Sequence, residues 1–509
     1  MSTTTMTTAQ WTKNVIKQDE IDRYLTDDKD FINEDLIWQQ IKDGRDPSRE
    51  VVEAIIEKAR NLNRLEPEET ATLLNVKDDE LWEKMFEVGL EIKRKVYDNR
   101  VVFFAPMYLS NLCVNNCAYC GFREENKHEK RHVLTLDEMK TETAALVSEG
   151  HKRIIAVYGE HPKSNADYIA KSIEEIYKVK APSPKGTGTG HVRRVNVNAA
   201  PMCIEDLKKL WNVGIGTYQV FQETYHKETY KNMHPENTLK GNYQWRLYAL
   251  HRAMEAGIDD VAIGALFGLY DWRFEVMGLL YHTIDLEQRF GIGPHTISFP
   301  RMMHASHSDV SDNSEYKVSD EDFKKLVAVL RLSVPYTGLI ITAREKAELR
   351  KEVIKIGCTQ TDASTRIGVG GYSDKADGGK VEQVDDEQQF LLGDTRTCDE
   401  VIRELAEMGM ITSFCTAGYR CGRTGEKIMG LLQECVEGKF CKLNAVLTYR
   451  EYLDDYASEE TKKLGEKVIL KELEQIGKME FYRKGSGKLY DLFHKLYKEV
   501  QEGQRDVFI

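Results

Sequence analysis

The spacing of apolar residues changes once along this chain, near residue 100. Before that point, segments such as EVVEAIIEKARNL and ELWEKMFEVGLEIKRKVY place apolar side chains three and four residues apart, the period of an amphipathic helix. After it, short β-branched runs alternate with helix-length amphipathic segments. The pattern predicts an N-terminal helical segment over residues 1–98, followed by a β/α repeat.

The β/α repeat contains eight candidate strands. They are residues 101–108, 153–158, 192–198, 217–222, 260–267, 295–299, 338–342 and 355–360. Amphipathic segments, for example 136–148, 169–179 and 320–332, lie between most of them. This alternation predicts the α/β class and a (β/α)8 barrel of the TIM type over residues 99–372. A doubly wound open sheet is the alternative.

Two further regions follow the predicted barrel. Residues 373–393 are polar and contain glycine, which predicts a linker or flexible loop. Residues 394–509 have a helical pattern and contain four closely spaced cysteines. We interpret them as a helical C-terminal domain.

Composition restricts the partners and the location. The chain has 509 residues and a formal net charge of −12, which argues against nucleic acid or an anionic membrane as its main partner. No apolar stretch approaches the roughly 18–20 residues that span a bilayer, and the N-terminus lacks the pattern of a secretory signal. We therefore expect a cytoplasmic protein whose clustered cysteines serve metal or redox chemistry.

The first cysteine cluster follows the first predicted strand. The segment LSNLCVNNCAYCGFR spaces Cys113, Cys117 and Cys120 as C-x3-C-x2-C, where barrels of this type form their active sites. Three thiolates can bind three irons of a [4Fe–4S] cluster and leave the fourth open to a small molecule. Thiolates also suit zinc, but a structural zinc site needs a fourth ligand, for which His128 is the nearest candidate.

This motif, with the aromatic Tyr119 before its last cysteine, resembles that of the radical S-adenosylmethionine (SAM) superfamily. The resemblance implies a [4Fe–4S] cluster whose open iron binds SAM, and a 5′-deoxyadenosyl radical that takes a hydrogen atom from substrate. It also implies SAM contacts at later strand ends. Here these residues are Gly159 and Glu160 in VYGE, Asn196 and Asn198 in RRVNVNAA, and Gly264 in GALFGLYD. Each of them could equally be an ordinary turn or solvated residue.

A closer resemblance covers the chain from about residue 50 onward. APMYLSNLCVNNCAYCGFR, GIGTYQVFQETYH, GPHTISFPR, VPYTGLIITAREK and CGRTGEKIMG are most similar to the tyrosine lyases of this superfamily. The resemblance implies cleavage of the Cα–Cβ bond of L-tyrosine to p-cresol and dehydroglycine (2-iminoacetate), with a flavodoxin- or ferredoxin-type electron donor. The 2-iminoacetate synthases of thiamine biosynthesis release dehydroglycine. The [FeFe]-hydrogenase maturases convert it to CO and cyanide at a second cluster.

The resemblance also assigns substrate residues. Arg344 in TAREK matches the arginine that holds the substrate carboxylate, although a surface ion pair with Glu345 or Glu348 is an alternative. Tyr108 lies five residues before Cys113, where the lyases place an aromatic residue near the substrate. His295 in GPHTIS is a further pocket candidate or a hydrogen-bonded core residue.

One segment departs from the lyase pattern near the substrate. The lyases usually have Ser-Ala-Gly-Ser after the last barrel strand, whereas this chain has Asp362-Ala-Ser364-Thr. Asp362 could bind the substrate ammonium group or pair with Arg366. This departure leaves open another aromatic amino acid, such as tryptophan, as the substrate.

The second cysteine cluster is incomplete. The maturases hold their second cluster with C-x2-C-x22-C, and Cys415 and Cys441 match its first and third ligands. Gly418 stands where the second cysteine is expected and cannot bind metal. Cys421 or Cys435 could supply a replacement, or the site is vestigial. The gap favours a 2-iminoacetate synthase-type enzyme, with a maturase of altered second cluster and a non-catalytic iron–sulfur carrier as alternatives.

Overall fold

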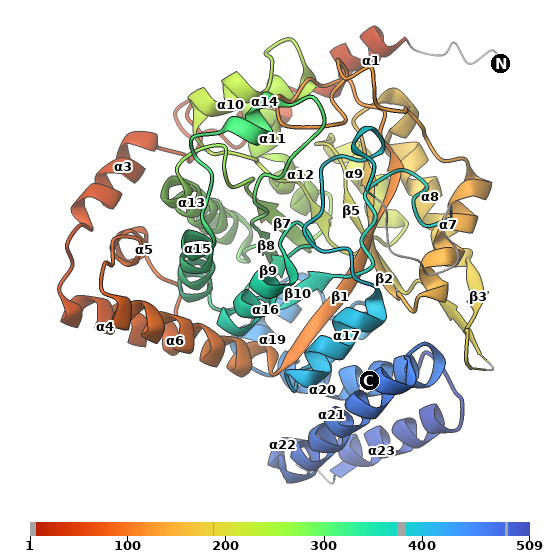
Figure 1. Cartoon of the computed structure of the whole chain (residues 1–509). Helices are drawn as coiled ribbons and strands as arrows, with labels where there is room; N and C mark the ends of the chain where they lie inside the picture. The colour runs from red at the N-terminus through yellow and green to blue at the C-terminus, as the bar shows by residue number, and fades with distance from the viewer. Residues whose placement is uncertain (1–6, 187, 374–382, 484–486) are drawn as a thin grey trace.

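The computed structural model describes residues 7–186, 188–373, 383–483 and 487–509. Eight parallel strands close into a barrel, because the last of them, β10, pairs with the first, β1, over Val102–Phe104 (Figure 1). In barrel order the strands are β1 (Arg100–Ser110), β2 (Arg153–Tyr158), β5 (Arg194–Asn198), β6 (Tyr218–Gln219), β7 (Val261–Gly264), β8 (Thr296–Ser298), β9 (Gly338–Ile341) and β10 (Gln360–Asp362). The predicted (β/α)8 barrel is confirmed.

Burial explains the composition of these strands. All eleven residues of β1 are buried, as expected of a strand covered by helices outside and by side chains inside the barrel. The helices between the strands are α7 (Leu136–Ser148), α8 (Ala166–Lys178), α9 (Ile204–Asn212), α10 (Lys227–Met233), α11 (Tyr243–Leu247), α12 (Ala249–Glu255), α13 (Trp272–Phe290), α14 (Asp309–Asn313), α15 (Asp320–Ser333) and α16 (Ala347–Ile356). A small antiparallel pair, β3 (Lys180–Pro182) and β4 (Thr189–His191), follows α8.

The prediction of the eighth strand was wrong in position. We expected a strand over residues 355–360, but α16 continues to Ile356 and the strand is Gln360–Asp362. Leu349, Val353 and Ile356 are buried at helical spacing, so the apolar run belongs to the inner face of α16.

The N-terminal helices precede the barrel; in Figure 1 those between residues 34 and 97 lie at its left, and the first lies at the top. They are α1 (Thr8–Val15), α2 (Asp19–Asp22), α3 (Glu34–Asp43), α4 (Arg49–Arg60), α5 (Pro67–Leu73) and α6 (Asp79–Tyr97). The longest, α6, contacts α15 and α16 and leads directly into β1. Its apolar face therefore belongs to the same core as the barrel helices.

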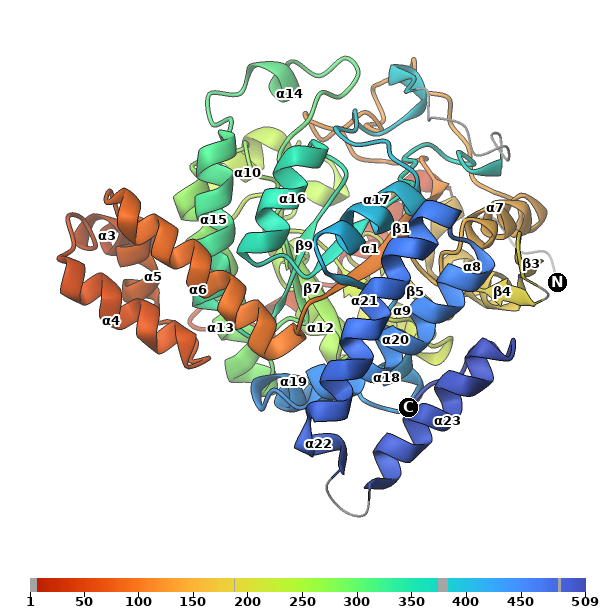
Figure 2. The ribbon, with the colours of Figure 1, turned by 60° about the horizontal axis from the view of Figure 1, so that its bottom comes forward.

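The C-terminal region lies against the foot of the barrel, meaning the amino ends of its strands. Its short strand β11 (Ile411–Ser413) pairs in parallel with the first residues of β1, Arg100–Val102. In Figure 2, where the bottom of the molecule comes forward, the C-terminal helices lie in front of the barrel. They are α17 (Cys398–Glu407), α18 (Ala417–Arg420), α19 (Gly425–Gln433), α20 (Glu437–Asp455), α21 (Glu459–Lys478), α22 (Glu480–Arg483) and α23 (Lys488–Gln501). None of the helices in the described part of the chain is long and apolar enough to cross a membrane.

We predict that Gly89→Ala destabilises the fold. A Cβ at Gly89 of α6 would collide with the carbonyl oxygen of Ile356 at the end of α16. Separating the two helices should lower the free energy of unfolding by about 1–3 kcal/mol, measured by denaturant titration. The control is Gly430→Ala in α19, where a Cβ meets nothing within 4 Å, so that stability should stay equal or rise by up to about 1 kcal/mol. Equal stability of both variants would contradict the prediction.

Candidate active site

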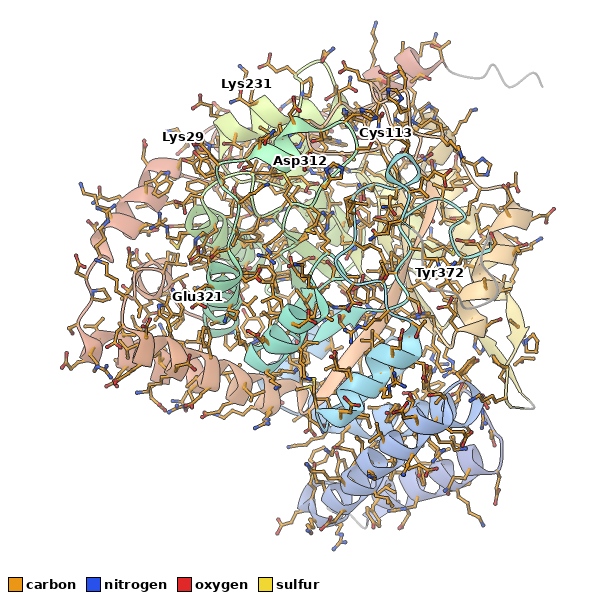
Figure 3. The ribbon with its side chains drawn as sticks, viewed as in Figure 1. Lys29, Cys113, Lys231, Asp312, Glu321 and Tyr372 are labelled. Carbon is orange, nitrogen blue, oxygen red and sulfur yellow. The ribbon has the colours of Figure 1, made fainter. Side chains whose placement is uncertain are left out.

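A cavity opens at the carboxyl ends of the barrel strands, and Cys113, Cys117 and Cys120 line it. Cys113 is labelled in Figure 3 at the end of the barrel away from the C-terminal helices. Burial, and then the neighbouring Cys120 and Cys113, raise the pKa of Cys117 to about 12. Three thiolates in this position would repel one another, so their ionised form requires a bound cation.

The polar contacts of these cysteines suit an iron–sulfur cluster. Asn115 Nδ2 lies 3.6 Å from Cys113 Sγ, and Gln389 Nε2 lies 3.6 Å from Cys120 Sγ. Hydrogen bonds to the sulfurs are among the means by which proteins tune such clusters. In the described residues, no three His, Cys, Asp or Glu side chains gather tightly enough to hold a single metal ion. A cubane instead takes one thiolate on each of three irons.

His128, the fourth ligand that a zinc site would need, does not line this cavity. Its ring stacks on that of His307, with 4.2 Å between the centroids. The described structure therefore does not bring His128 to the three cysteines.

Two of the predicted SAM residues lie directly beside the cysteines. Glu160 lines the cavity, and its Oε2 accepts a hydrogen bond of 2.6 Å from Asn115, the residue that also contacts Cys113. Burial raises the pKa of Glu160. Gly159 also lines the cavity, and a Cβ there would collide with the carbonyl oxygen of Leu112, so the close approach of the two loops requires glycine.

Of the two predicted asparagines, the structure places one in the cavity and the other outside it. Asn198, at the end of β5, lines the cavity. Asn196 lies deeper in the barrel, where its Oδ1 accepts hydrogen bonds from Arg194 Nε at 2.8 Å and Thr217 N at 3.0 Å. Gly264 does not line the cavity either, but a Cβ there would lie 2.5 Å from the ring of Phe221, which does. Gly264 therefore shapes the wall indirectly.

Tyr119 lines the cavity with its hydroxyl anchored. Its OH lies 2.7 Å from His234 Nε2, and the other ring nitrogen, Nδ1, lies 2.8 Å from the carbonyl oxygen of Tyr230. Burial holds the pKa of His234 well below its usual value, so the ring is neutral, with its proton on Nδ1. Tyr119 accordingly donates to Nε2.

A group of charged residues beside the cysteines was not predicted. Glu223 Oε1 accepts hydrogen bonds from Lys240 Nζ at 2.8 Å and Arg246 Nη2 at 3.1 Å, and all three residues line the cavity. Glu223 has a left-handed backbone with φ of 70°, which is strained for a side chain of this kind. The segment FQETYH was recognised only as part of the lyase resemblance; no spacing rule singles out its glutamate.

Arg344 reaches the same cavity with a free charge. Its guanidinium carbon lies 3.3 Å from the centroid of the Phe390 ring. Among the described residues its one hydrogen bond, of 3.4 Å, goes to the carbonyl oxygen of Arg301. Glu345 is not its partner, because Glu345 pairs with Arg301. Burial lowers the pKa of Arg344. No described carboxylate pairs with Arg344, so a ligand carboxylate could do so.

Asp362, at the end of β10, also lines the cavity, but it does not pair with Arg366. Its Oδ1 accepts from Ala343 N at 2.7 Å, and its Oδ2 accepts from Thr365 Oγ1 at 2.7 Å. The nearest cation is Arg350, whose Nη2 lies 3.5 Å away. Burial raises the pKa of Asp362, although these contacts oppose the shift.

Two predicted substrate residues lie outside the cavity. Ser364 Oγ accepts a hydrogen bond of 2.7 Å from Cys398 N and so holds the start of α17. His295 precedes β8 at the foot of the barrel, where Asp260 and Arg194 interact with it electrostatically. The error for His295 arose because it begins its strand, whereas the active-site loops follow the strands.

The segment predicted as a linker contributes to the site. Residues 374–382 lie outside the described residues, but Gln389 and Phe390 line the cavity. Gln389 connects two predicted site residues, since its Oε1 accepts from Tyr108 OH at 2.9 Å while its Nε2 approaches Cys120. Leu391 N donates to the carbonyl oxygen of His304 at 2.8 Å and fixes the segment across the barrel mouth.

Comparison with known proteins places this geometry in a family. The sequence model of the radical SAM superfamily matches residues 107–276, and that of the Biotin and Thiamin Synthesis associated domain matches residues 298–411. The crystal structure of HydG, a maturase of the [FeFe]-hydrogenase, is 45% identical with a TM-score of 0.87, and the match covers 94% of this chain and 100% of that one. The chain belongs to the radical SAM superfamily.

Two further relatives agree with this assignment. HydG from Carboxydothermus hydrogenoformans is 35% identical over 94% of this radical SAM chain and 99% of its own, with a TM-score of 0.75. The 2-iminoacetate synthase of Escherichia coli K12 is 28% identical over 365 residues, which are 70% of this chain and 89% of that enzyme. Membership in the radical SAM superfamily implies a [4Fe–4S] cluster and SAM, and Cys113, Cys117 and Cys120 are the residues that would hold the cluster.

We predict that Gln389→Leu lowers the midpoint potential of this cluster in the radical SAM chain. The change removes the N–H group that faces Cys120 Sγ, and hydrogen bonds to the sulfurs favour the reduced, more negative cluster. A redox titration followed by electron paramagnetic resonance (EPR) measures the potential. The control is Gln388→Leu, because Gln388 contacts Gln383 instead of a cysteine. An unchanged potential in Gln389→Leu would show that Gln389 does not tune the cluster.

Proposed function

We propose that this enzyme is a tyrosine lyase that cleaves the Cα–Cβ bond of L-tyrosine to p-cresol and dehydroglycine. The observation that carries the proposal is a half-buried arginine, Arg344, which has no carboxylate partner among the described residues and lies in the same cavity as the three cysteines. The names of the relatives, 2-iminoacetate synthase and HydG maturase, support it.

The cavity offers a complementary group for each part of an aromatic amino acid. Arg344 suits the α-carboxylate, because a guanidinium can bind both of its oxygens. Asp362 suits the α-ammonium group, since its carboxylate keeps lone pairs beyond the two hydrogen bonds that it accepts. The wall includes apolar side chains suited to the aromatic ring, among them Phe104, Ile155, Val157, Ile340 and Leu392.

Within this proposal, the residues of the chain position the substrate and exclude water. Cys113, Cys117 and Cys120 would hold the cluster, which with SAM would supply one electron and a 5′-deoxyadenosyl radical able to take a hydrogen atom from the substrate. Arg344 and Asp362 fix the backbone atoms of tyrosine so that the abstracted hydrogen lies within reach. Phe390 covers the guanidinium group of Arg344, and Gln389 holds Tyr108. The electron donor we propose is of the flavodoxin or ferredoxin type.

We infer that dehydroglycine is released for use in thiazole synthesis, because Gly418 breaks the set of thiolates with which the maturases convert it. A maturase-like enzyme is the second candidate. The 45% identity to the HydG structure over 94% of the chain favours it. The two candidates share the lyase reaction and differ in the fate of its product.

Anaerobic incubation with tyrosine, SAM and dithionite tests both candidates in one assay. Release predicts p-cresol, 5′-deoxyadenosine and glyoxylate, the hydrolysis product of dehydroglycine, in similar amounts and without CO. A maturase predicts CO that haemoglobin can trap, with correspondingly less glyoxylate. Formation of 5′-deoxyadenosine without p-cresol would reject tyrosine as the substrate, and tryptophan is the next to test.

We predict that Arg344→Gln impairs tyrosine binding and spares SAM. Removal of one partner from a buried charged pair costs about 2–5 kcal/mol, so the KM for tyrosine should rise at least about 30-fold. The affinity for SAM, measured by calorimetry on the reconstituted enzyme, should stay unchanged. Arg301→Gln is the control, because Arg301 pairs with Glu345 instead of lining the cavity. An unaltered KM in Arg344→Gln would remove the assigned role.

Asp362 predicts a pH dependence of tyrosine binding. Its carboxylate binds the ammonium group only when ionised, and burial raises its pKa, so the KM for tyrosine should rise as pH falls through that raised value. Asp362→Asn keeps the shape, and we expect a higher KM that no longer changes in this pH range. A wild-type KM independent of pH, or a variant with the wild-type profile, would contradict the assignment.

A further inference from the structure

A carboxylate lies where the missing cysteine of the second cluster would project. A Cβ built on Gly418 of α18 has Glu437 Oε1 as its nearest neighbour, at 3.5 Å. Glu437 begins α20 one turn before Cys441, so the two side chains lie on the same face of the helix. Cys441 Sγ donates to the same Oε1 at 3.2 Å.

Cys415, which matches the first ligand of the maturase motif, lies beside Cys441, the neighbour of Glu437. The side chains of Cys415 and Cys441 interact with each other, although they come from separate segments at the foot of the barrel. The segment before α18 and the first turns of α20 therefore bring two thiol groups and one carboxylate together. The other cysteines of the region do not join this pair, since Cys421 is exposed and Cys435 interacts electrostatically with Lys439 and Lys95.

One carboxylate oxygen of Glu437 accepts no hydrogen bond among the described residues. This oxygen is Oε2, and only 1% of the surface of Glu437 is exposed. Arg423 Nε donates a hydrogen bond of 3.3 Å to Oε1 and lies 3.1 Å from Oε2, so one cation already pairs with the carboxylate. Because Oε2 itself accepts no hydrogen bond, it is the oxygen that could bind a metal without the loss of an existing hydrogen bond.

Buried arginines provide the surrounding charge. Arg100, Arg153 and Arg194 all interact electrostatically with Cys415. Each is at most 2% exposed. Arg153 and Arg194 keep guanidinium N–H groups without hydrogen-bond partners in the described structure. Such a surrounding would stabilise a group of net negative charge, which a cluster bound by two thiolates and a carboxylate would be.

We propose that Cys415, Cys441 and Glu437 hold a second iron–sulfur cluster, with the carboxylate of Glu437 in place of the thiolate missing at Gly418. Carboxylates bind iron in many protein sites, so the donor set suits the metal. The proposal concerns what this site binds and goes beyond the lyase reaction. It holds whether or not tyrosine is the substrate, and it leaves the fate of dehydroglycine to the CO measurement.

The test separates the two sites by removing the first. The full-length variant Cys113→Ala/Cys117→Ala/Cys120→Ala, reconstituted without oxygen with Fe²⁺ and sulfide, should still bind about four irons and four sulfides per chain. It should also give an EPR signal on reduction. Adding Glu437→Gln, which keeps the size of the side chain, should abolish the bound iron and the signal. The matched control is Glu434→Gln, since Glu434 is an exposed neighbour.

A rescue variant makes the test specific. A Cβ at position 418 has no contact closer than 3.5 Å, so Gly418→Cys should be accommodated and, added to Glu437→Gln, should restore the iron and sulfide. The proposal is overturned if the triple variant folds, as judged by circular dichroism, yet binds no iron and sulfide. It is also overturned if it binds zinc alone, or if Glu437→Gln leaves the iron unchanged.

A second measurement applies if the triple variant does not fold. With the first site intact, Glu437→Gln should reduce the iron content from about eight to about four per chain while SAM cleavage continues. An equal iron content in the two proteins would overturn the proposal. Because iron is counted independently of products, failure here cannot be confused with failure of the lyase assignment.

Discussion

The placement of three mutually repelling thiolates at one end of a closed barrel is the constraint on which this structure depends. Cys113, Cys117 and Cys120 lie in the loop after β1, in a cavity that also contains Lys240. Lys240 opposes the rise in the pKa of Cys117. The barrel supplies the dry walls and the neighbouring N–H groups that a buried anionic cluster requires. The side chain of Asn115 contacts both Cys113 and Glu160 and so connects the cluster site to a predicted SAM residue.

The opposite end of the barrel also contains thiol groups beside negative charge, and there arginine side chains supply the compensating positive charge. There the thiol groups of Cys415 and Cys441 lie beside a carboxylate, and arginines from three barrel strands surround them. Arg100, Arg153 and Arg194 each begin a strand, so closure of the barrel alone brings their positive charges together. The fold therefore places compensating charge at the foot in the same way that it places binding loops at the mouth.

The sequence predicted the barrel and the first cysteine site, because short segments of the chain determine both. The alternation of apolar runs predicted the barrel, and the C-x3-C-x2-C spacing predicted the site. Phe390 could not be found in this way. It belongs to a polar segment without periodicity, and only the folded chain brings it 3.3 Å from Arg344. Likewise His295 and Ser364 have suitable side chains, but the strand end or loop conformation at which each lies directs it away from the cavity.

A spacing motif counts thiolates only, so it leaves out any carboxylate that lies beside the second pair of cysteines. Position 418 supplies no donor atom, yet the donor that a metal requires can come from any residue that reaches the same space. Glu437 is nineteen positions away from Gly418 in sequence, and its Oε1 lies 3.5 Å from where a Cβ at 418 would be. A carboxylate is a harder ligand than a thiolate but has the same charge. Exchanging one for the other would therefore preserve the balance with the surrounding arginines while changing the affinity and potential of what is bound.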